Sequence, residues 1–214
     1  MKTYQSGAVS IAVEQREPET SDAHPGMLVL HGSMGAGSYW MGRFAPTLAR
    51  LGIAAYAPRY LQKTGSLLAT SKKILDGKHF PAWLAAVRDA VSYVAERPGI
   101  DAQRIGILGF SLGGYLAMAL AAEERRIRAV IELSGGLPPG WEGQVSPGMA
   151  PVLLLHGTND AVVPVAEAYR AERVLKERGV VCELEVFPGE RHWITGAAQA
   201  RLLTRCAEFL KKNL

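Results

Sequence analysis

The sequence has no apolar run that approaches the roughly 20 residues needed to cross a lipid bilayer. Its first residues also lack the continuous apolar segment that follows the positive charge of a secretory signal peptide. The first absence excludes a membrane-spanning helix, and we therefore expect no membrane partner. The two absences together predict a protein of the cytoplasm.

Cysteine is scarce, because the 214 residues include only two, too few for a disulfide framework. Cys182 falls in an alternating strand pattern and Cys206 in a helical one, so we expect both to be reduced residues of the core. Neither these cysteines nor His31 and His156 have the spacing of a metal site. We interpret the two histidines as packing residues or as residues that support the catalytic side chains from behind, and we expect no metal and no cofactor.

The sequence also lacks a strong excess of charge of one sign. Its 24 Lys and Arg residues against 20 Asp and Glu residues give a net charge of +4, and the charges are dispersed. The densest basic cluster, Arg125-Arg126-Ile127-Arg128, follows Glu123-Glu124 at a predicted helix end, where basic residues complement the helix dipole. Since no interleaved aromatic residues accompany this cluster, we expect no nucleic-acid partner.

Short apolar runs alternate with longer amphipathic ones, which is typical of an α/β protein with a mostly parallel sheet and helices on both faces. The length suits one domain with a sizeable core, and no repeat or linker interrupts it, so we expect a single domain over residues 1–214. About seven strands are expected: Val9–Glu14, Met27–His31, Ala54–Ala57, Arg104–Gly109, Ala129–Leu133, Pro151–His156 and Cys182–Phe187. Outside the segment around residue 111, the expected helices are Pro81–Arg97, Val165–Arg178 and Ala197–Lys212.

Two further expectations concern the edge of the sheet and its connections. The strict alternation of Val9–Glu14 places this strand at an exposed edge. Glu17–Gly26 and Leu137–Gly148 are rich in turn-forming residues and are predicted to be long loops. Long loops in compact domains often carry functional residues, and the second one contains Trp141.

The segment Gly109-Phe110-Ser111-Leu112-Gly113 lies between an apolar predicted strand and an Ala/Leu-rich helix former. A chance match to Gly-x-Ser-x-Gly is expected in roughly one sequence in ten, so the pattern alone is modest evidence. A serine at a strand-to-helix turn between glycines is, however, the nucleophile elbow of an α/β-hydrolase. The glycines leave room for a tight turn that presents the Ser111 hydroxyl beside the N–H of Leu112.

A serine nucleophile needs a base, and the base needs a third group that orients it. Hydrolases of this fold place these residues in the order serine, acid, histidine. Asp160 is the only aspartate after Asp101, and His192 is the only histidine beyond Asp160. Both follow predicted strands, at the sheet edge where ligands bind in open α/β folds. We predict a triad of Ser111, His192 and Asp160, with Glu132 as the alternative acid.

The oxyanion of the transition state needs backbone N–H donors that are already in place. We expect Leu112 to supply one and the glycine-rich loop His31–Gly37 to supply the other. Ser33 is the favoured donor in that loop and Met34 the alternative, although the loop could also be a plain turn. The candidate residues for a substrate pocket are Met34, Tyr39, Trp40, Trp141 and Trp193.

These motifs resemble those of the dienelactone hydrolase family of the α/β-hydrolases, from His31-Gly32 through Gly109–Gly114 and Gly157–Pro164 to His192. The resemblance covers nearly the whole chain and implies a compact sheet with helices on both faces and no large cap domain. Family members that open dienelactones look as though they use a cysteine nucleophile and carry an acidic residue in the early loop. This chain instead has Ser111 and His31-Gly32-Ser33-Met34 at those places.

The resemblance and the predicted triad together imply a serine hydrolase without a cofactor that acts on small carboxylic esters, with lactones and thioesters as further candidates. A peptidase or acyl-aminoacyl hydrolase would use the same triad, and a dienelactone hydrolase proper would share the fold. A binding protein that has kept the fold without catalysis belongs to a different class. The expected partner is a small-molecule ester, and the sequence leaves the oligomeric state open.

Overall fold

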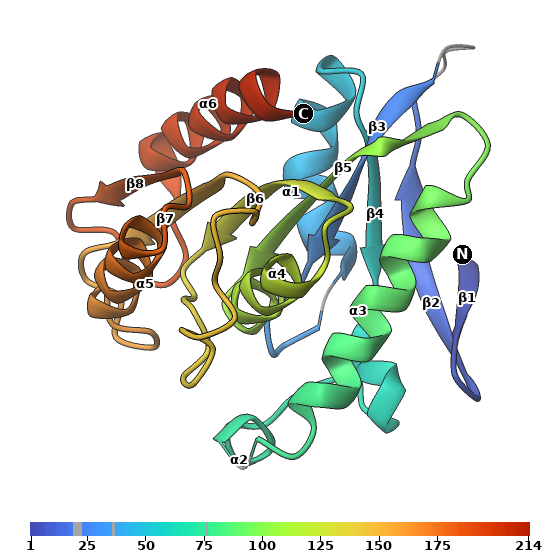
Figure 1. The fold of residues 1–214 in the computed structure, drawn as a ribbon, viewed down its shortest axis with the longest axis horizontal. Helices are drawn as coiled ribbons and strands as arrows, with labels where there is room; N and C mark the ends of the chain where they lie inside the picture. Colours follow the sequence, from blue (N-terminus) through green and yellow to red (C-terminus); the bar gives the residue numbers. More distant parts are fainter. Residues whose placement is uncertain (19–22, 36, 76) are drawn as a thin grey trace.

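The computed structural model describes residues 1–18, 23–35, 37–75 and 77–214. Eight strands of these residues form one sheet in the order β1-β2-β4-β3-β5-β6-β7-β8 (Figure 1). Strands β3 to β8 run parallel, whereas β1 pairs antiparallel with β2, and β2 with β4. The strands are β1 (Lys2–Ser6), β2 (Val9–Arg16), β3 (His24–Leu30), β4 (Ala54–Pro58), β5 (Ile100–Phe110), β6 (Ile127–Leu133), β7 (Val152–Gly157) and β8 (Cys182–Phe187). The predicted mostly parallel sheet is confirmed.

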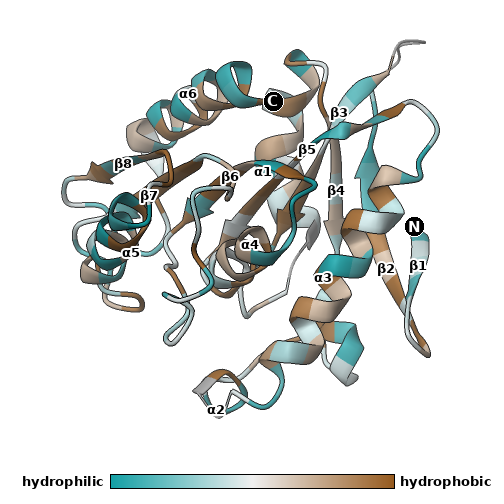
Figure 2. Cartoon of the chain, in the orientation of Figure 1, coloured by the Kyte–Doolittle hydropathy of each residue, from teal (hydrophilic) through white to brown (hydrophobic). Residues whose placement is uncertain are grey.

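Helices cover both faces of this sheet. One face packs against α1 (Gly37–Arg50) and α6 (Gly196–Asn213). The other packs against α3 (Phe80–Ala95), α4 (Leu112–Glu123) and α5 (Ala166–Glu177). The apolar residues of the middle strands lie between these layers, while hydrophilic residues gather on α5 and α6 (Figure 2). The central strands are therefore buried on both faces, as their continuous apolar runs predict.

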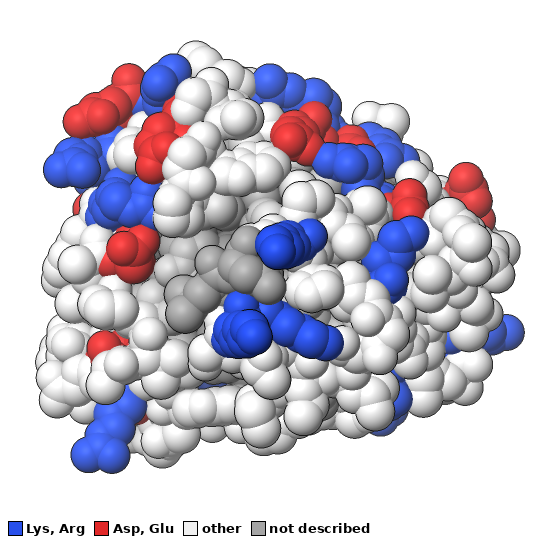
Figure 3. Space-filling model, turned by 90° about the horizontal axis from the view of Figure 1, so that it is seen from below, with Lys and Arg blue, Asp and Glu red and all other residues white. Residues whose placement is uncertain are grey.

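The described part of the connection from β4 to α3 contains only the short helices η1 (Tyr60–Thr64) and α2 (Ser71–Leu75). The described residues contain no large cap domain, as the family resemblance implies. They also contain no helix with the length and apolar character needed to cross a membrane. On the face seen from below in Figure 3, some basic side chains lie close together near the centre, and others lie beside acidic side chains toward the upper edge.

The structure corrects the expectations at the N-terminal edge of the sheet. The strand β1 was not among the expected ones, and it covers the outer side of β2, so β2 is not the edge strand. Strand β3 begins at His24 and takes in the end of the predicted loop Glu17–Gly26, of which residues 19–22 lie outside the described residues. Helix α1 was also not among the expected helices, because Gly42 and Pro46 interrupt its pattern.

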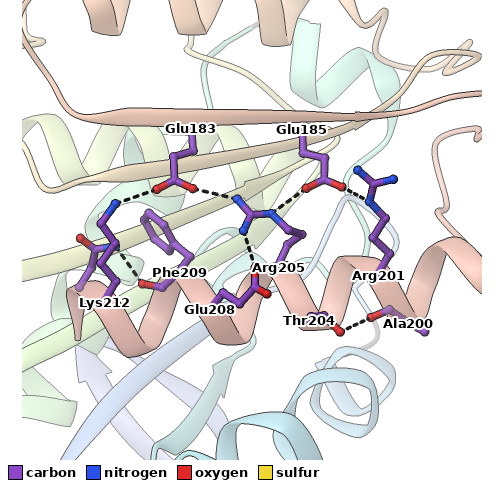
Figure 4. A network of polar contacts seen from close by, with 10 residues as sticks. Glu183, Glu185, Ala200, Arg201, Thr204, Arg205, Glu208, Phe209 and Lys212 are labelled. Carbon is purple, nitrogen blue, oxygen red and sulfur yellow. Dashed lines mark hydrogen bonds and ion pairs between the residues drawn. The ribbon is translucent and has the colours of Figure 1, made fainter.

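A network of charged side chains holds α6 against the edge strand β8 (Figure 4). Arg205 on α6 bridges two glutamates of β8, with its guanidinium 2.8 Å from Glu183 Oε2 and 2.7 Å from Glu185 Oε2. Lys212 adds a second contact to Glu183, and Arg201 adds one to Glu185. The loop that carries His192 connects β8 to α6, so this network holds together the two elements that the loop joins.

Candidate active site

Ser111 occupies the sharp turn between β5 and α4. Its φ of 54° and ψ of −119° lie in a region that residues with a side chain rarely adopt, so the turn stores strain. A Cβ atom on Gly109 would lie 2.0 Å from the carbonyl oxygen of Gly113, and one on Gly113 would lie 2.6 Å from that of His31. The turn therefore requires both glycines, for the steric reason that the sequence indicates.

The structure brings the three predicted triad residues into one hydrogen-bonded chain. His192 Nε2 lies 3.1 Å from Ser111 Oγ, and His192 Nδ1 lies 2.7 Å from Asp160 Oδ2. The side chains are largely buried, since Ser111, Asp160 and His192 are 8%, 7% and 9% exposed. Because the carboxylate can only accept, Nδ1 carries the proton and Nε2 is free to accept the serine hydroxyl.

Backbone contacts join the loop after β7, which carries Asp160, to the loop after β8, which carries His192. The N–H of Asn159 donates to the carbonyl of Glu190 at 2.8 Å, and the N–H of Gly189 donates to Thr158 Oγ1 at 2.8 Å. A Cβ on Gly157 would lie 2.4 Å from the Glu190 carbonyl oxygen, so only glycine allows the two loops to approach this closely. These contacts between the two loops hold Asp160 next to His192.

Asp160 has further hydrogen-bond donors besides His192. The backbone N–H groups of Val162 and Val163 donate to Oδ1 at 2.8 and 2.9 Å. His156 Nε2 lies 2.8 Å from the Val163 carbonyl oxygen and 3.3 Å from Asp160 Oδ2. Two acceptors around one nitrogen require it to carry the proton, and burial lowers the pKa of His156, which keeps the ring neutral. Of the two roles that the sequence suggests for His156, packing or support of the catalytic side chains, this contact with the predicted acid favours the second.

Glu132, the alternative acid, lies beneath the elbow. Its carboxyl accepts the N–H of Gly135 and is fully buried, and a Cβ on Gly114 would lie 2.9 Å from its Oε1. Burial raises the pKa of Glu132 to about 8, so this side chain is a neutral acid at neutral pH. His192 forms its carboxylate contact with Asp160, so the geometry favours the first prediction over the alternative.

The loop after β3 lies directly over Ser111. A Cβ on Gly32 would lie 3.0 Å from the Phe110 ring and 3.3 Å from Ser111 Cβ. The hydroxyl of Tyr60 donates to the His31 carbonyl at 2.6 Å, and the two rings stack with centroids 4.3 Å apart. Burial lowers the pKa of His31 to about 4, and His31 Nδ1 lies 2.8 Å from the Gly32 carbonyl, to which the neutral ring donates.

Hydrogen bonds also order the loop segment that would supply the second oxyanion donor. The N–H of Gly35 donates to the Gly32 carbonyl at 3.1 Å, and the N–H of Ala69 donates to the Ser33 carbonyl at 2.8 Å. Ser33 is half-buried, whereas Met34 is exposed. Ala36 of the predicted loop lies outside the described residues. The N–H groups of Ser33 and Leu112 remain the predicted oxyanion donors, with Met34 as the alternative.

A cleft of about 210 Å³ opens beside Ser111. Met34, Trp40 and Trp193 line it, as expected for pocket residues. Sequence reasoning missed Phe110 and Val162, although the position of Phe110 next to the nucleophile was a signal for it. The other lining residues are Gly32, Ser33, Gly35, Ser111 and His192.

Two of the expected pocket residues lie elsewhere. Trp141 is half-buried and packs against Phe80 on the α3 face, with ring centroids 6.4 Å apart, because its loop runs along the core and not over the cleft. Tyr39 is exposed and contacts Trp193 edge to face at 5.5 Å, outside the cleft. Neither residue is among those that line the cleft, so the pocket prediction is corrected for both.

Both cysteines are free, and Cys206 is fully packed in the core between α6 and the sheet. Burial raises the pKa of both thiols. In the part of the chain that the structure describes, no three His, Cys, Asp or Glu side chains form a group that could hold a metal ion.

The eight-stranded sheet, the helices on both faces and the serine elbow after β5 define the class of the protein as an α/β-hydrolase. The model of the dienelactone hydrolase family matches residues 11–201, and the chain belongs to this family of hydrolases.

The relatives cover several activities. A candidate carboxymethylenebutenolidase of Methylorubrum extorquens is 30% identical over 68% of this chain, which spans 55% of that relative. The acylamino-acid-releasing enzyme of Arabidopsis thaliana is 26% identical over 83% of this chain and 28% of its own. The structure of a dienelactone hydrolase-like promiscuous phosphotriesterase from metagenomic libraries is 21% identical, with a TM-score of 0.85 over 98% of this chain and 95% of its own.

Proposed function

We propose that this hydrolase cleaves small carboxylic esters with Ser111 as its nucleophile. The observation that carries this proposal is the hydrogen-bonded chain from Ser111 through His192 to Asp160. The small, mostly apolar cleft beside Ser111 supports a substrate of modest size, since pockets for drug-sized ligands are roughly 300–1,000 Å³. Lactones and thioesters offer the same electrophilic carbonyl and are further candidate substrates.

In the first half of the reaction, Ser111 Oγ bonds to the ester carbonyl carbon while His192 Nε2 takes the hydroxyl proton. Asp160 stabilises the imidazolium that forms. The N–H groups of Leu112 and Ser33 stabilise the oxyanion, which is the charge that develops only in the transition state. The carbon–oxygen bond of the ester then breaks, and His192 gives its proton to the departing alcohol, leaving Ser111 acylated.

In the second half, a water molecule attacks the acyl carbonyl and gives a proton to His192 Nε2. The bond to Ser111 Oγ breaks, the proton returns to this oxygen, and the carboxylic acid leaves. A peptidase would follow the same steps with an amine as leaving group, so the triad supports both reactions. We place the ester first because the chain belongs to the dienelactone hydrolase family, and a lactone is a cyclic ester.

A panel of p-nitrophenyl esters from acetate to long acyl chains tests this proposal, run beside lactones, thioesters and a matched anilide. We expect turnover of the short esters and a loss of roughly a thousandfold or more in kcat for Ser111→Ala. Ser10→Ala is the matched control, because Ser10 is exposed on β2. Ester turnover by Ser111→Ala within about tenfold of the parent protein would refute the assignment, and faster turnover of the anilide would favour the peptidase.

A further inference from the structure

Three aromatic side chains from three separate elements form one wall of the cleft beside Ser111. Trp40 comes from α1, Phe110 from the end of β5 and Trp193 from the loop after β8. Trp40 stacks on Phe110 with ring centroids 4.2 Å apart, and Trp193 lies 5.3 Å from Trp40 and 4.8 Å from Phe110. Trp40 and Phe110 are buried, whereas Trp193 is 40% exposed. The cleft thus has a fixed aromatic base and an aromatic rim that a bound ring can cover.

The size of the cleft suits one ring. Its volume is about 210 Å³, and an apolar protein cavity of roughly 150 Å³ binds benzene. Among the described residues that line the cleft, none is Lys, Arg, Asp or Glu, and the ionisable side chain is that of His192. A charged group would lose its hydration here without gaining an ionic partner, so the chemistry of the cleft selects a neutral group.

The position of the aromatic wall indicates which part of an ester it contacts. The Phe110 ring lies 4.8 Å from the His192 ring, and Trp193 follows His192 directly in the chain. In the proposed reaction, His192 gives its proton to the departing alcohol, so the alcohol portion is next to His192 when the bond breaks. The aromatic wall therefore lies on the alcohol side of the scissile bond.

Building on the proposed esterase function, we propose that this cleft binds a neutral, planar aromatic ring in the alcohol portion of the ester, as in a benzyl ester. Aromatic rings gain stabilisation from offset or edge contacts with other rings beyond the burial of their area. A saturated ring of similar size gains the burial alone. The wall of Trp40, Phe110 and Trp193 therefore discriminates by planarity as well as by size.

Matched esters test this proposal. Benzyl acetate and cyclohexylmethyl acetate share the acyl group and have primary alcohols as leaving groups, so they differ mainly in the planarity of the ring. Methyl phenylacetate and methyl cyclohexylacetate make the same comparison with the ring in the acyl portion. We expect kcat/KM to be roughly threefold to tenfold higher for benzyl acetate than for cyclohexylmethyl acetate, and a smaller ratio for the second pair.

Two variants connect this ratio to the cleft. Trp193→Leu removes the aromatic rim, and we expect the benzyl to cyclohexylmethyl ratio to fall toward one. Tyr169→Leu is the matched control, since Tyr169 is 48% exposed on α5 and is not among the lining residues. The control is expected to keep the ratio of the parent protein.

The outcomes separate this proposal from the proposed function. Turnover of all four esters without a preference for benzyl acetate would overturn the aromatic subsite alone. A larger preference for the aromatic ring in the pair of methyl esters than in the pair of acetates would overturn the placement of the subsite on the alcohol side. A ratio that Trp193→Leu leaves unchanged would overturn its assignment to this cleft. Failure to hydrolyse any ester, p-nitrophenyl acetate included, would overturn the proposed function and this assignment together.

Discussion

His156 Nε2 lies 3.3 Å from Asp160 Oδ2, the same oxygen that binds His192. Both side chains of this pair are fully buried, and the other carboxylate oxygen accepts two backbone N–H groups. His156 is therefore part of the set of donors around Asp160. Because His156 donates to the oxygen that faces His192, it helps to fix the orientation of the carboxylate against the proposed catalytic base.

His156→Phe removes this donor and keeps a ring in the buried site. Asp160 then loses a donor that fixes its orientation, and we expect kcat to fall by roughly tenfold with little change in KM, because a misplaced carboxylate misorients the proposed base. His156→Gln offers an amide N–H near the position of Nε2 and should lose less activity. Equal losses of kcat in His156→Phe and His156→Gln would show that the ring serves packing alone.

Tyr60→Phe tests how the loop over Ser111 is held. The change removes the 2.6 Å hydrogen bond to the His31 carbonyl and leaves a buried acceptor unpaired, which costs about 1–3 kcal/mol of stability. We expect kcat to fall more than KM changes, because this loop carries the Ser33 N–H that we propose as an oxyanion donor.

Tyr4→Phe is the control for this variant. Tyr4 is buried, and its hydroxyl donates to the Ala86 carbonyl at 2.8 Å on the α3 face of the sheet. It should lose a similar amount of stability, measured by chemical unfolding, and keep its kcat. An equal loss of kcat in both variants would contradict a specific role of Tyr60.

Gly109→Ala tests the steric basis of the elbow. The added methyl group would lie 2.0 Å from the Gly113 carbonyl oxygen, and this backbone atom cannot move without displacing α4. We expect a large loss of thermal stability or no folded protein. Gly42→Ala is the control, because an added Cβ there meets nothing within 4 Å and alanine favours the interior of α1. A Tm for Gly109→Ala equal to that of the control would contradict the elbow geometry.

Glu132→Gln should remove a pH dependence of stability. In the unfolded chain this carboxyl ionises near its ordinary pKa of 4.5, whereas in the folded protein it keeps its proton up to a pKa of about 8. The folded state therefore binds more protons between these values, and the stability of the parent protein falls as pH rises from about 4.5 to 8. Chemical unfolding of both proteins at pH 5 and pH 8 measures this difference. Parallel changes in the two free energies of unfolding would count against a buried neutral Glu132.

The sequence carried strong local signals for the parallel strands and for the elbow. The apolar run before Gly109 and the Ala/Leu-rich segment after Ser111 predicted the strand, turn and helix that the structure contains. Asp160 and His192 could be singled out because few other candidates follow Ser111 and because both residues come just after strands. Their proximity, with Nδ1 2.7 Å from the carboxylate, is a property of the fold.

The features that sequence reasoning missed depend on strand pairing, packing and turn geometry, which the residue types alone do not specify. Strand β1 is short, and only its pairing with β2 defines it. Trp141 lies on a long loop that could have passed over the cleft, and its packing against Phe80 decides otherwise. The contact of His156 with Asp160 arises from the turn after β7, which a pattern of residue types does not specify.

The central claim is that Ser111 is the nucleophile of a triad with His192 and Asp160. Treatment with a fluorophosphonate probe, followed by intact-mass measurement and peptide mapping, tests it most directly, because such a probe bonds to an activated serine. We predict one adduct per chain, located on Ser111, and little labelling of His192→Gln or Asp160→Asn. An adduct on another serine, or ester turnover by a protein whose Ser111 stays unlabelled, would contradict the account.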